Sequence, residues 1–336
     1  MTPHGKAASE ICAKHPNTAS MTLARMLFKQ EPLLFKNAEH ARDLVRYYRG
    51  RMGKENKARV SRAGSIVQSA KAKLCPFENL PEGITHFSER TPLKITGKAT
   101  VLVLSDIHAP YHDKQALSLA MKMGKKRKAT HVILNGDIAD FFSISFWEKD
   151  PRKRDLAAEI KVIKKVLASI RRVFPRARII YKLGNHEERW ERYLSVKAPE
   201  LLGVEDFEID KVLGLKSLGM EIVRDCRPIR LGKLNIIHGH EFRWGITSPV
   251  NPARGFYQRG KEHALGGHLH QTSSHSEKSM NDVVISCWST GCLCDLKPDY
   301  ARFNKWNHGF AIVEAQKNGR FMVNNYKIMD GTLFDD

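Results

Sequence analysis

The 336-residue sequence predicts an α+β protein in which two central sheets are flanked by helices, as four α/β/β/α layers, behind a small all-α module. Residues 1 to about 50 carry apolar side chains at helical spacing. From Ala99 to Asn185, short apolar runs alternate with amphipathic stretches in a βαβαβ order. The chain from Asp282 onward is typical of successive antiparallel strands, which a second sheet packed on the first would explain.

The N-terminal module is predicted to hold three short helices. Their segments are 7–13, 20–28 and 38–48. Pro16–Thr18 separates the first two helices, Ser20 is expected to cap the second, Pro32 marks its end, and Asn37 marks the start of the third. Three short helices with a tight first turn are compatible with a helix-turn-helix module. A plain helical cap or an oligomerisation element explains the pattern equally well.

Residues 51–73 form a basic stretch, in which seven Lys and Arg face one acidic residue, Glu55. Such a stretch can neutralise backbone phosphates. Prolines then punctuate the chain, and we expect a basic helical module at 1–75, a linker at 76–98 and a catalytic domain at 99–336. The formal charge of +20 and the pI near 9.7 favour nucleic acid as partner, although a solvated basic surface would give the same values.

Five motifs with metal-ligand residues are spread over half of the chain. They are Asp106-Ile-His108, Gly136-Asp-Ile-Ala-Asp140, Gly184-Asn-His-Glu187, His238-Gly-His240 and Gly267-His-Leu-His270. Four of them directly follow apolar runs of strand length, and the run before His268 is a less obvious strand. Because strand ends on one edge of a sheet converge, we expect these residues to meet around two ions.

Helices are predicted between these strands at 114–123 and 156–172, and further strands at 282–286, 309–314 and 320–328. The mixture of carboxylate, imidazole and amide groups in the motifs suits Mn, Fe or Zn, whereas Ca favours more oxygen and structural Zn favours thiolates. Two such ions can activate a shared water for attack on a phosphoester, so no Ser or Cys nucleophile is needed. The six cysteines are interpreted as core or bystander residues.

In their order and spacing, the five motifs resemble those of the calcineurin-like metallophosphoesterase superfamily. The resemblance covers Ala99 to the C-terminus and leaves out the N-terminal module, and the overall layout is similar to phage and prophage metallophosphoesterases. It implies the four-layer metallophosphoesterase sandwich. It also implies that one metal is held by Asp106, His108 and His270, a second by Asn185, His238 and His268, and that Asp137 bridges them.

The resemblance also implies the catalytic residues. His186 is expected to face the substrate and to protonate the leaving oxygen, with Asp140 as its orienting partner. His238 ends its strand and is favoured over His240 as the ligand, which leaves His240 and His112 as supporting residues. Arginine forks and aromatic rings near the motifs are candidates for substrate contact, or surface residues. These candidates are Arg189, Arg243, Arg254, Tyr257 and Arg259.

The function predicted from all of this is a phosphodiesterase or nuclease that acts on DNA or RNA through a metal-bridging hydroxide. Its cofactors are two divalent ions, Mn foremost, with Fe, Zn or Ni as options. The alternatives are a phosphomonoesterase acting on protein or small molecules, a cyclic-nucleotide phosphodiesterase, and a non-catalytic nucleic-acid-binding protein. No apolar run approaches the roughly 20 residues that span a bilayer, no signal-peptide pattern opens the chain, and the cysteines form no disulfide framework, so a cytoplasmic protein without membrane contact is expected.

Overall fold

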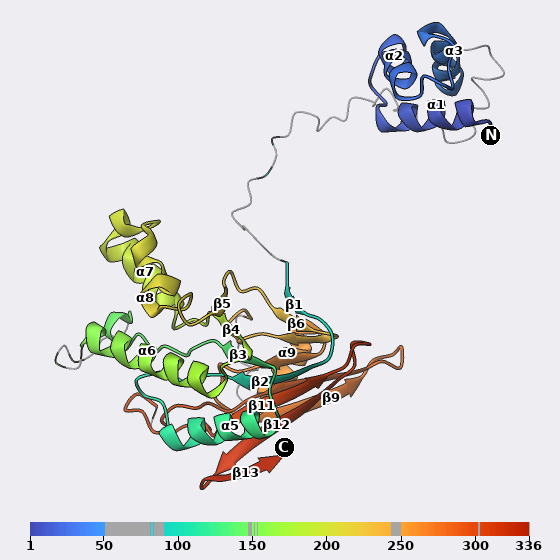
Figure 1. Cartoon of the computed structure of the whole chain (residues 1–336). Coiled ribbons are helices and arrows are strands. Elements are labelled where there is room, and N and C mark those ends of the chain that lie inside the picture. The colour runs from blue at the N-terminus through green and yellow to red at the C-terminus, as the bar shows by residue number, and fades with distance from the viewer. Residues whose placement is uncertain are drawn as a thin grey trace. The chain divides into compact units, whose positions relative to one another are not determined.

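The computed structural model describes residues 1–50, 81, 83, 91–146, 150, 152, 154–242, 250–301 and 303–335. The chain divides into two compact units, residues 1–85 and 86–336, which Figure 1 shows in colour from the N-terminus to the C-terminus. The predicted basic arm at 51–73 and most of the predicted linker lie outside the described residues. The predicted boundaries at 75 and 98 therefore stay predictions.

The N-terminal unit contains the three predicted helices, α1 (Pro3–Lys14), α2 (Ser20–Gln30) and α3 (Ala38–Tyr48). Asn37 caps α3 as predicted, because its side chain accepts a hydrogen bond of 2.8 Å from the backbone amide of His40. The prediction for Ser20 is wrong: the cap position of α2 is Ala19. The Ser20 hydroxyl instead accepts a hydrogen bond of 3.2 Å from the buried guanidinium of Arg49, which also holds the preceding loop.

A seven-stranded sheet in the order β13-β12-β11-β2-β3-β4-β5 is the centre of the larger unit. Its strands are β2 (Ala99–Leu104), β3 (His131–Asn135), β4 (Arg178–Lys182), β5 (Met220–Val223), β11 (His308–Ala315), β12 (Phe321–Met329) and β13 (Thr332–Asp335). The strands β2 to β5 are parallel, and β11, β12 and β13 continue the sheet in antiparallel pairs. We call this sheet B.

A six-stranded sheet in the order β1-β6-β7-β8-β10-β9 packs on sheet B and is called sheet A. Its strands are β1 (Leu93–Ile95), β6 (Ile229–Leu231), β7 (Leu234–Ile236), β8 (Ala264–Gly266), β9 (Ser273–Lys278) and β10 (Val284–Ser289). Strand β1 pairs with β6 and lies inside the predicted linker, so the described part of the larger unit begins before Ala99.

The remaining elements of the described residues are helical. They are α5 (Lys114–Lys126), η1 (Phe142–Ile144), α6 (Leu156–Val173), α7 (Glu188–Lys197), η3 (Pro199–Leu201), η4 (Glu205–Phe207), α8 (Ile209–Leu213) and α9 (Pro252–Gly260). The predicted helices at 114–123 and 156–172 correspond to α5 and α6.

Alternating side chains of the central strands build the layers. Val101 and Val103 face sheet A in one cluster, while Leu102 and Leu104 face α5 and α6 in another. Helix α9 covers the far face of sheet A through Phe256. The order is therefore helices, sheet B, sheet A and helix, and the predicted four-layer α/β/β/α fold is confirmed (Figure 1).

One detail of the predicted topology is wrong. We expected the C-terminal strands to form the second sheet, but β11, β12 and β13 extend the first, and of the predicted strands beyond 280 β10 alone lies in sheet A. The physical reason is that β2 is buried on both faces and needs a partner on its free edge. The almost fully buried β11 supplies that partner.

Among the described residues, no helix combines the length and the apolar character needed to cross a membrane.

Candidate metal centre

The five motifs begin at the carboxyl ends of strands, in both sheets. Asp106, Asp137 and Asn185 follow the parallel neighbours β2, β3 and β4 of sheet B. His238 and His268 follow the parallel neighbours β7 and β8 of sheet A, so the less obvious strand before His268 is present. Because neighbouring parallel strands end at the same edge of a sheet, the loops that follow these strands lie close together, and those of both sheets contribute to one site.

The backbone of these loops is unusual. Asp106, His108, Asp137, His268 and His270 all have positive φ angles, between 47° and 68°. Non-glycine residues rarely adopt this left-handed conformation, and where they do it is often because a functional site requires it.

The glycines of the motifs are required by close approach. A Cβ on Gly184 would collide with Asp137, and a Cβ on Gly267 would collide with Ser105 and Asp106. A Cβ on Gly136, which also has a positive φ of 81°, would overlap the ring of His238. The loops can therefore converge because these positions lack side chains.

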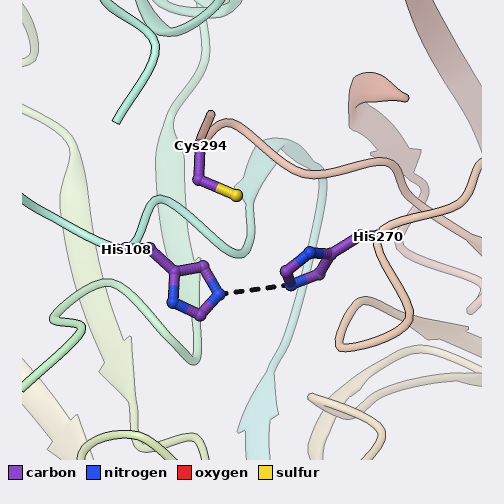
Figure 2. Close-up of side chains that lie close together, drawn as sticks. All are labelled: His108, His270 and Cys294. Atoms are coloured by element: carbon purple, nitrogen blue, oxygen red, sulfur yellow. Dashed lines mark hydrogen bonds between the residues drawn. The ribbon is translucent and has the colours of Figure 1, made fainter. Parts of the chain in front are cut away.

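One group of buried ligand atoms combines Asp106, His108 and His270. The Nε2 atoms of the two histidines are 3.2 Å apart, as the dashed line in Figure 2 marks, and His270 Nε2 is 3.1 Å from Asp106 Oδ1. The other ring nitrogen of His108 is 2.8 Å from Asp140 Oδ1. Because Asp140 accepts the Nδ1 proton of His108, the lone pair of Nε2 is directed toward His270 and Asp106.

A second group lies on the other side of Asp137. Asp137 Oδ2 is 3.3 Å from His238 Nε2 and 3.8 Å from His108 Nε2, so this carboxylate lies between the two groups. Ligand atoms of Asp137, His238 and His268 lie within 4.8 Å of one another, and the loop of Asn185 is held against Asp137 by a 2.9 Å hydrogen bond from the His186 amide.

The donor set fits divalent cations. The Nδ1 proton of His238 is donated to the carbonyl oxygen of Asn135 at 2.7 Å, which leaves Nε2 as a free acceptor. That Nε2 atom and the Oδ1 atom of Asn185 are buried and receive no hydrogen bond from any described residue. Buried acceptors without donors are costly, and a cation would satisfy both.

The pKa shifts of the histidines in the two groups also indicate that positive charge is favoured there. Burial alone would lower the pKa of His238, but the charge of Asp137 raises it to about 9, and Asp106 has the same effect on His270. Burial and the nearby His238 lower the pKa of His268 to about 4. The two carboxylates therefore attract positive charge into a buried place, and either a proton or a metal ion on the ring nitrogens of His238 and His270 would supply it.

His186 and Asp140 are brought together at the edge of these groups. His186 Nδ1 is 3.0 Å from Asp140 Oδ1, and Arg189 donates to His186 Nε2 at 2.8 Å and to the Asp140 carbonyl oxygen at 2.8 Å. Burial works against the charged form of His186, yet Asp137 and Asp140 raise its pKa. Of the four predicted substrate-contact residues that the structure describes, Arg189 is the one that lies at this place.

Two carboxylates that sequence reasoning passed over hold the loops. Glu187 accepts hydrogen bonds of 2.8 to 2.9 Å from the amides of Asp137, Ile138, Ala139 and Gly184 and from the Tyr181 hydroxyl. Glu187 is the last residue of the Gly184-Asn-His-Glu187 motif, and its position in this motif is the sequence feature that could have indicated its role.

The second carboxylate, Glu241, accepts a hydrogen bond of 2.9 Å from the amide of His238 and pairs at 2.9 Å with the fully buried ammonium group of Lys182. Burial alone would raise the pKa of Glu241, but Lys182 and His240 lower it to about 2. No sequence pattern marks this pair.

The other predicted residues lie as follows. His240 Nε2 lies 3.0 Å from Glu188 Oε1, whereas His238 Nε2 lies 3.3 Å from Asp137 Oδ2, so the geometry favours His238 over His240. His112 forms an isolated antiparallel β-bridge with Cys294, next to the group of Asp106, His108 and His270. Arg254 and Arg259 are exposed on α9, and Tyr257 contacts His275 of β9. Arg243 lies outside the described residues.

The chain is similar in sequence to a known family and to two phage proteins. A family model described as calcineurin-like phosphoesterase matches residues 99–272. The chain is 25% identical over 228 residues to the Gene 54 protein of Mycobacterium phage L5, covering 63% of this chain and 88% of that protein. It is 25% identical over 252 residues to the Gene 54 protein of Mycobacterium phage D29, with 67% and 97% covered.

Solved structures are more distant. Vacuolar protein sorting 29 from Cryptosporidium parvum matches with 14% identity and a TM-score of 0.39, covering 71% of this chain and 96% of that chain.

Proposed function

This chain belongs to the calcineurin-like phosphoesterase family, and on that premise we propose that it is a two-metal phosphodiesterase that cleaves DNA or RNA. The family binds two divalent metals and hydrolyses phosphoesters. The observation that carries the proposal is the pair of ligand groups on either side of Asp137, with His186 at their edge.

The residues that would hold the ions divide as the two groups do. Asp106, His108 and His270 would hold one ion, Asn185, His238 and His268 the other, and Asp137 would contact both. When bound, the two ions supply an activated water as nucleophile and offset charge on the phosphoryl oxygens. We propose manganese as the first metal to test.

His186 would act on the leaving group. Asp140 accepts the proton on Nδ1, so Nε2 is the nitrogen that would carry the proton for the departing oxygen, once Arg189, which donates to Nε2 in this structure, turns to the phosphate. The charges of Asp137 and Asp140 raise the pKa of His186 and so favour its protonated form, which is the form that an acid requires. Arg189, beside Nε2, would place its guanidinium against the phosphate.

Aromatic side chains next to the ligand groups favour a polynucleotide over a small phosphate ester. The Trp306 ring lies 4.2 Å from that of His270, and Tyr300, which is 74% exposed, lies 6.2 Å from Trp306. Tyr111, which follows the Asp106 motif, is 46% exposed. Exposed rings beside a cationic centre are suited to stack on the bases of a single strand.

The positive charge of the chain supports the same substrate class. The formal charge is +20, and residues 1–50 alone carry eight Lys and Arg against four Asp and Glu. Arg49 is used internally, but Arg25 and Lys29 are exposed along α2. We propose that the N-terminal unit and the basic stretch 51–73 bind the phosphate backbone and leave cleavage to the other unit.

The test of this function is a substrate panel with Mn present. Single-stranded, double-stranded and nicked DNA and RNA are compared with bis-p-nitrophenyl phosphate and p-nitrophenyl phosphate. We expect cleavage of a polynucleotide and of the diester, loss of both in Asp137→Asn and His186→Ala, and retention in His275→Ala, a histidine of strand β9. Rapid hydrolysis of the monoester with every polynucleotide intact would contradict the nuclease proposal.

A truncation tests the N-terminal unit separately. Removing residues 1–75 is expected to weaken polynucleotide binding and to leave hydrolysis of bis-p-nitrophenyl phosphate unchanged. Equal polynucleotide affinity in the truncated protein would show that this part of the chain does not bind the substrate.

A further inference from the structure

A cysteine lies against the first ligand group. The thiol of Cys294 and one ring nitrogen each of His108 and His270 lie within 4.8 Å of one another. All three residues are buried, with 4%, 4% and 5% of their surface exposed. Figure 2 shows the Cys294 sulfur directed toward the space between the two imidazole rings. The sequence motifs do not include this residue.

Hydrogen bonds on both sides of Cys294 fix its position. The amide of Asp113 donates to the Leu293 carbonyl oxygen at 2.8 Å, and the amide of Asp295 donates to the Tyr111 carbonyl oxygen at 2.9 Å. The segment therefore runs beside the loop that follows His108, and it forms a backbone bridge to His112. The Leu293 amide also donates a hydrogen bond of 2.9 Å to the carbonyl oxygen of Asp106, which is itself one of the proposed metal ligands.

We propose that Cys294 is a further protein ligand of the ion held by Asp106, His108 and His270, in addition to Asp137. This inference rests on the proposed two-metal centre and assigns a residue that the family motifs leave out. Zinc binds sulfur at about 2.3 Å and imidazole nitrogen at about 2.0 to 2.1 Å in tetrahedral sites, so a sulfur and a nitrogen on one ion are about 3.5 Å apart. The three ligand atoms lie within 4.8 Å of one another, so small side-chain rotations would bring them onto one ion.

Binding exchanges one bond for another at the sulfur. The S–H bond of Cys294 breaks, its proton passes to the solvent buffer, and a sulfur–metal bond forms. No electrons are transferred, so the step needs no oxidant or reductant.

The consequence is that the two metal positions differ in chemistry. A thiolate is a soft ligand and favours Zn or Fe over Mn, whereas the Asn185, His238 and His268 group offers amide and imidazole donors. We therefore expect a centre in which the position beside Cys294 selects zinc or iron and the other position accepts manganese.

Cys292 provides a matched control on the same segment. It is buried like Cys294 and two residues away, and its thiol lies beside that of Cys294 and donates to the Asn307 carbonyl oxygen at 3.7 Å, but it is not a member of the cluster with His108 and His270. Cys292→Ser replaces a buried thiol next to Cys294 without removing a member of the cluster, so a difference between the two variants reports on metal contact.

The experiment is cobalt absorption spectroscopy on the full chain. Purified protein is depleted of metal and loaded with Co²⁺, and the cobalt bound per chain is measured independently by elemental analysis. We expect an intense sulfur-to-cobalt charge-transfer band in the near ultraviolet, which Cys294→Ser removes and Cys292→Ser retains. Cys294→Ser should also weaken zinc binding at least about tenfold, because even residues that only orient ligands contribute that much, and should change manganese affinity much less.

A second measurement needs no variant. X-ray absorption at the zinc edge of the wild-type protein should show one sulfur atom per two bound ions, at about 2.3 Å. Bound metal without a sulfur signal in either measurement overturns the assignment of Cys294. Retention of the cobalt band in Cys294→Ser, or its loss in Cys292→Ser alone, overturns it as well.

The same experiment separates this inference from the function on which it rests. A protein that binds two cobalt ions without sulfur and still cleaves polynucleotides leaves the proposed function intact. A protein that binds no cobalt contradicts the metal centre itself.

Discussion

Glu187→Gln is the substitution for which the structure makes the sharpest prediction. Glu187 is 1% exposed, and its Oε2 atom accepts hydrogen bonds from the amides of Asp137 and Gly184 while Oε1 accepts three others. A glutamine of the same shape must place an NH₂ group against at least two of these donors. Each buried donor left unsatisfied costs about 1–3 kcal/mol, so the free energy of unfolding should fall by about 2–6 kcal/mol.

The assay is urea unfolding followed by tryptophan fluorescence. All five tryptophans lie between residues 147 and 306, so the signal reports on the larger unit and not on residues 1–50. The matched control is Glu188→Gln, because the Glu188 side chain is 52% exposed and pairs with His240, and exposed pairs contribute about 0–1 kcal/mol.

Metal binding gives a second readout of the same change. Glu187 fixes the loop of Asp137, so Glu187→Gln should weaken Mn binding about 10- to 100-fold, as loss of a residue that orients a ligand does. Unfolding within about 1 kcal/mol of the wild type, together with unchanged Mn affinity, would refute the reasoning that Glu187 holds this loop.

Three further outcomes are expected. Asp140→Asn removes a carboxylate that raises the pKa of His186, so the loss of activity at high pH should begin at lower pH than in the wild type, and an unchanged pH–rate profile would contradict the acid role. The folded-state pKa of Glu241 is about 2, below its usual 4.5, so its ionised form adds about 3 kcal/mol to the free energy of unfolding above pH 4.5, and this is lost as the pH falls toward 2. Glu241→Gln should therefore make the free energy of unfolding, measured with urea, depend less on pH in that range. Tyr300→Ala should weaken binding of a single-stranded oligonucleotide by about 1–3 kcal/mol, as measured by fluorescence anisotropy. The control is Phe334→Ala, which removes an exposed aromatic ring of strand β13 and should leave this binding unchanged; equal effects of the two changes would exclude a specific stacking role for Tyr300.

The sequence was sufficient for much of the fold because local patterns carry it. Apolar runs before Asp106, Asp137, Asn185 and His238 predict strands, and the structure has β2, β3, β4 and β7 there. The helical repeat predicts α5 and α6 to within a few residues. These patterns are local, since a buried strand or an amphipathic helix is encoded by residues that are neighbours in sequence.

Partners across the sheets could not be predicted in the same way. Strands β10 and β11 are consecutive along the chain and similarly apolar, yet β10 joins sheet A beside β8 and β11 joins sheet B beside β2. Which edge a strand joins depends on which edge is left open by strands far away in sequence. No periodicity within the strand records that.

The amino-acid sequence by itself determined the kind of chemistry, because glycines, carboxylates and imidazoles in fixed short motifs restrict both the backbone and the ligands. Tertiary structure decided which residues outside those motifs serve the same centre. The Lys182–Glu241 pair and the Cys294 thiol reach it through contacts between segments 59 residues apart or more than 180 residues from His108. Such contacts arise from the packing of two sheets, where distance along the chain has no bearing on distance in space.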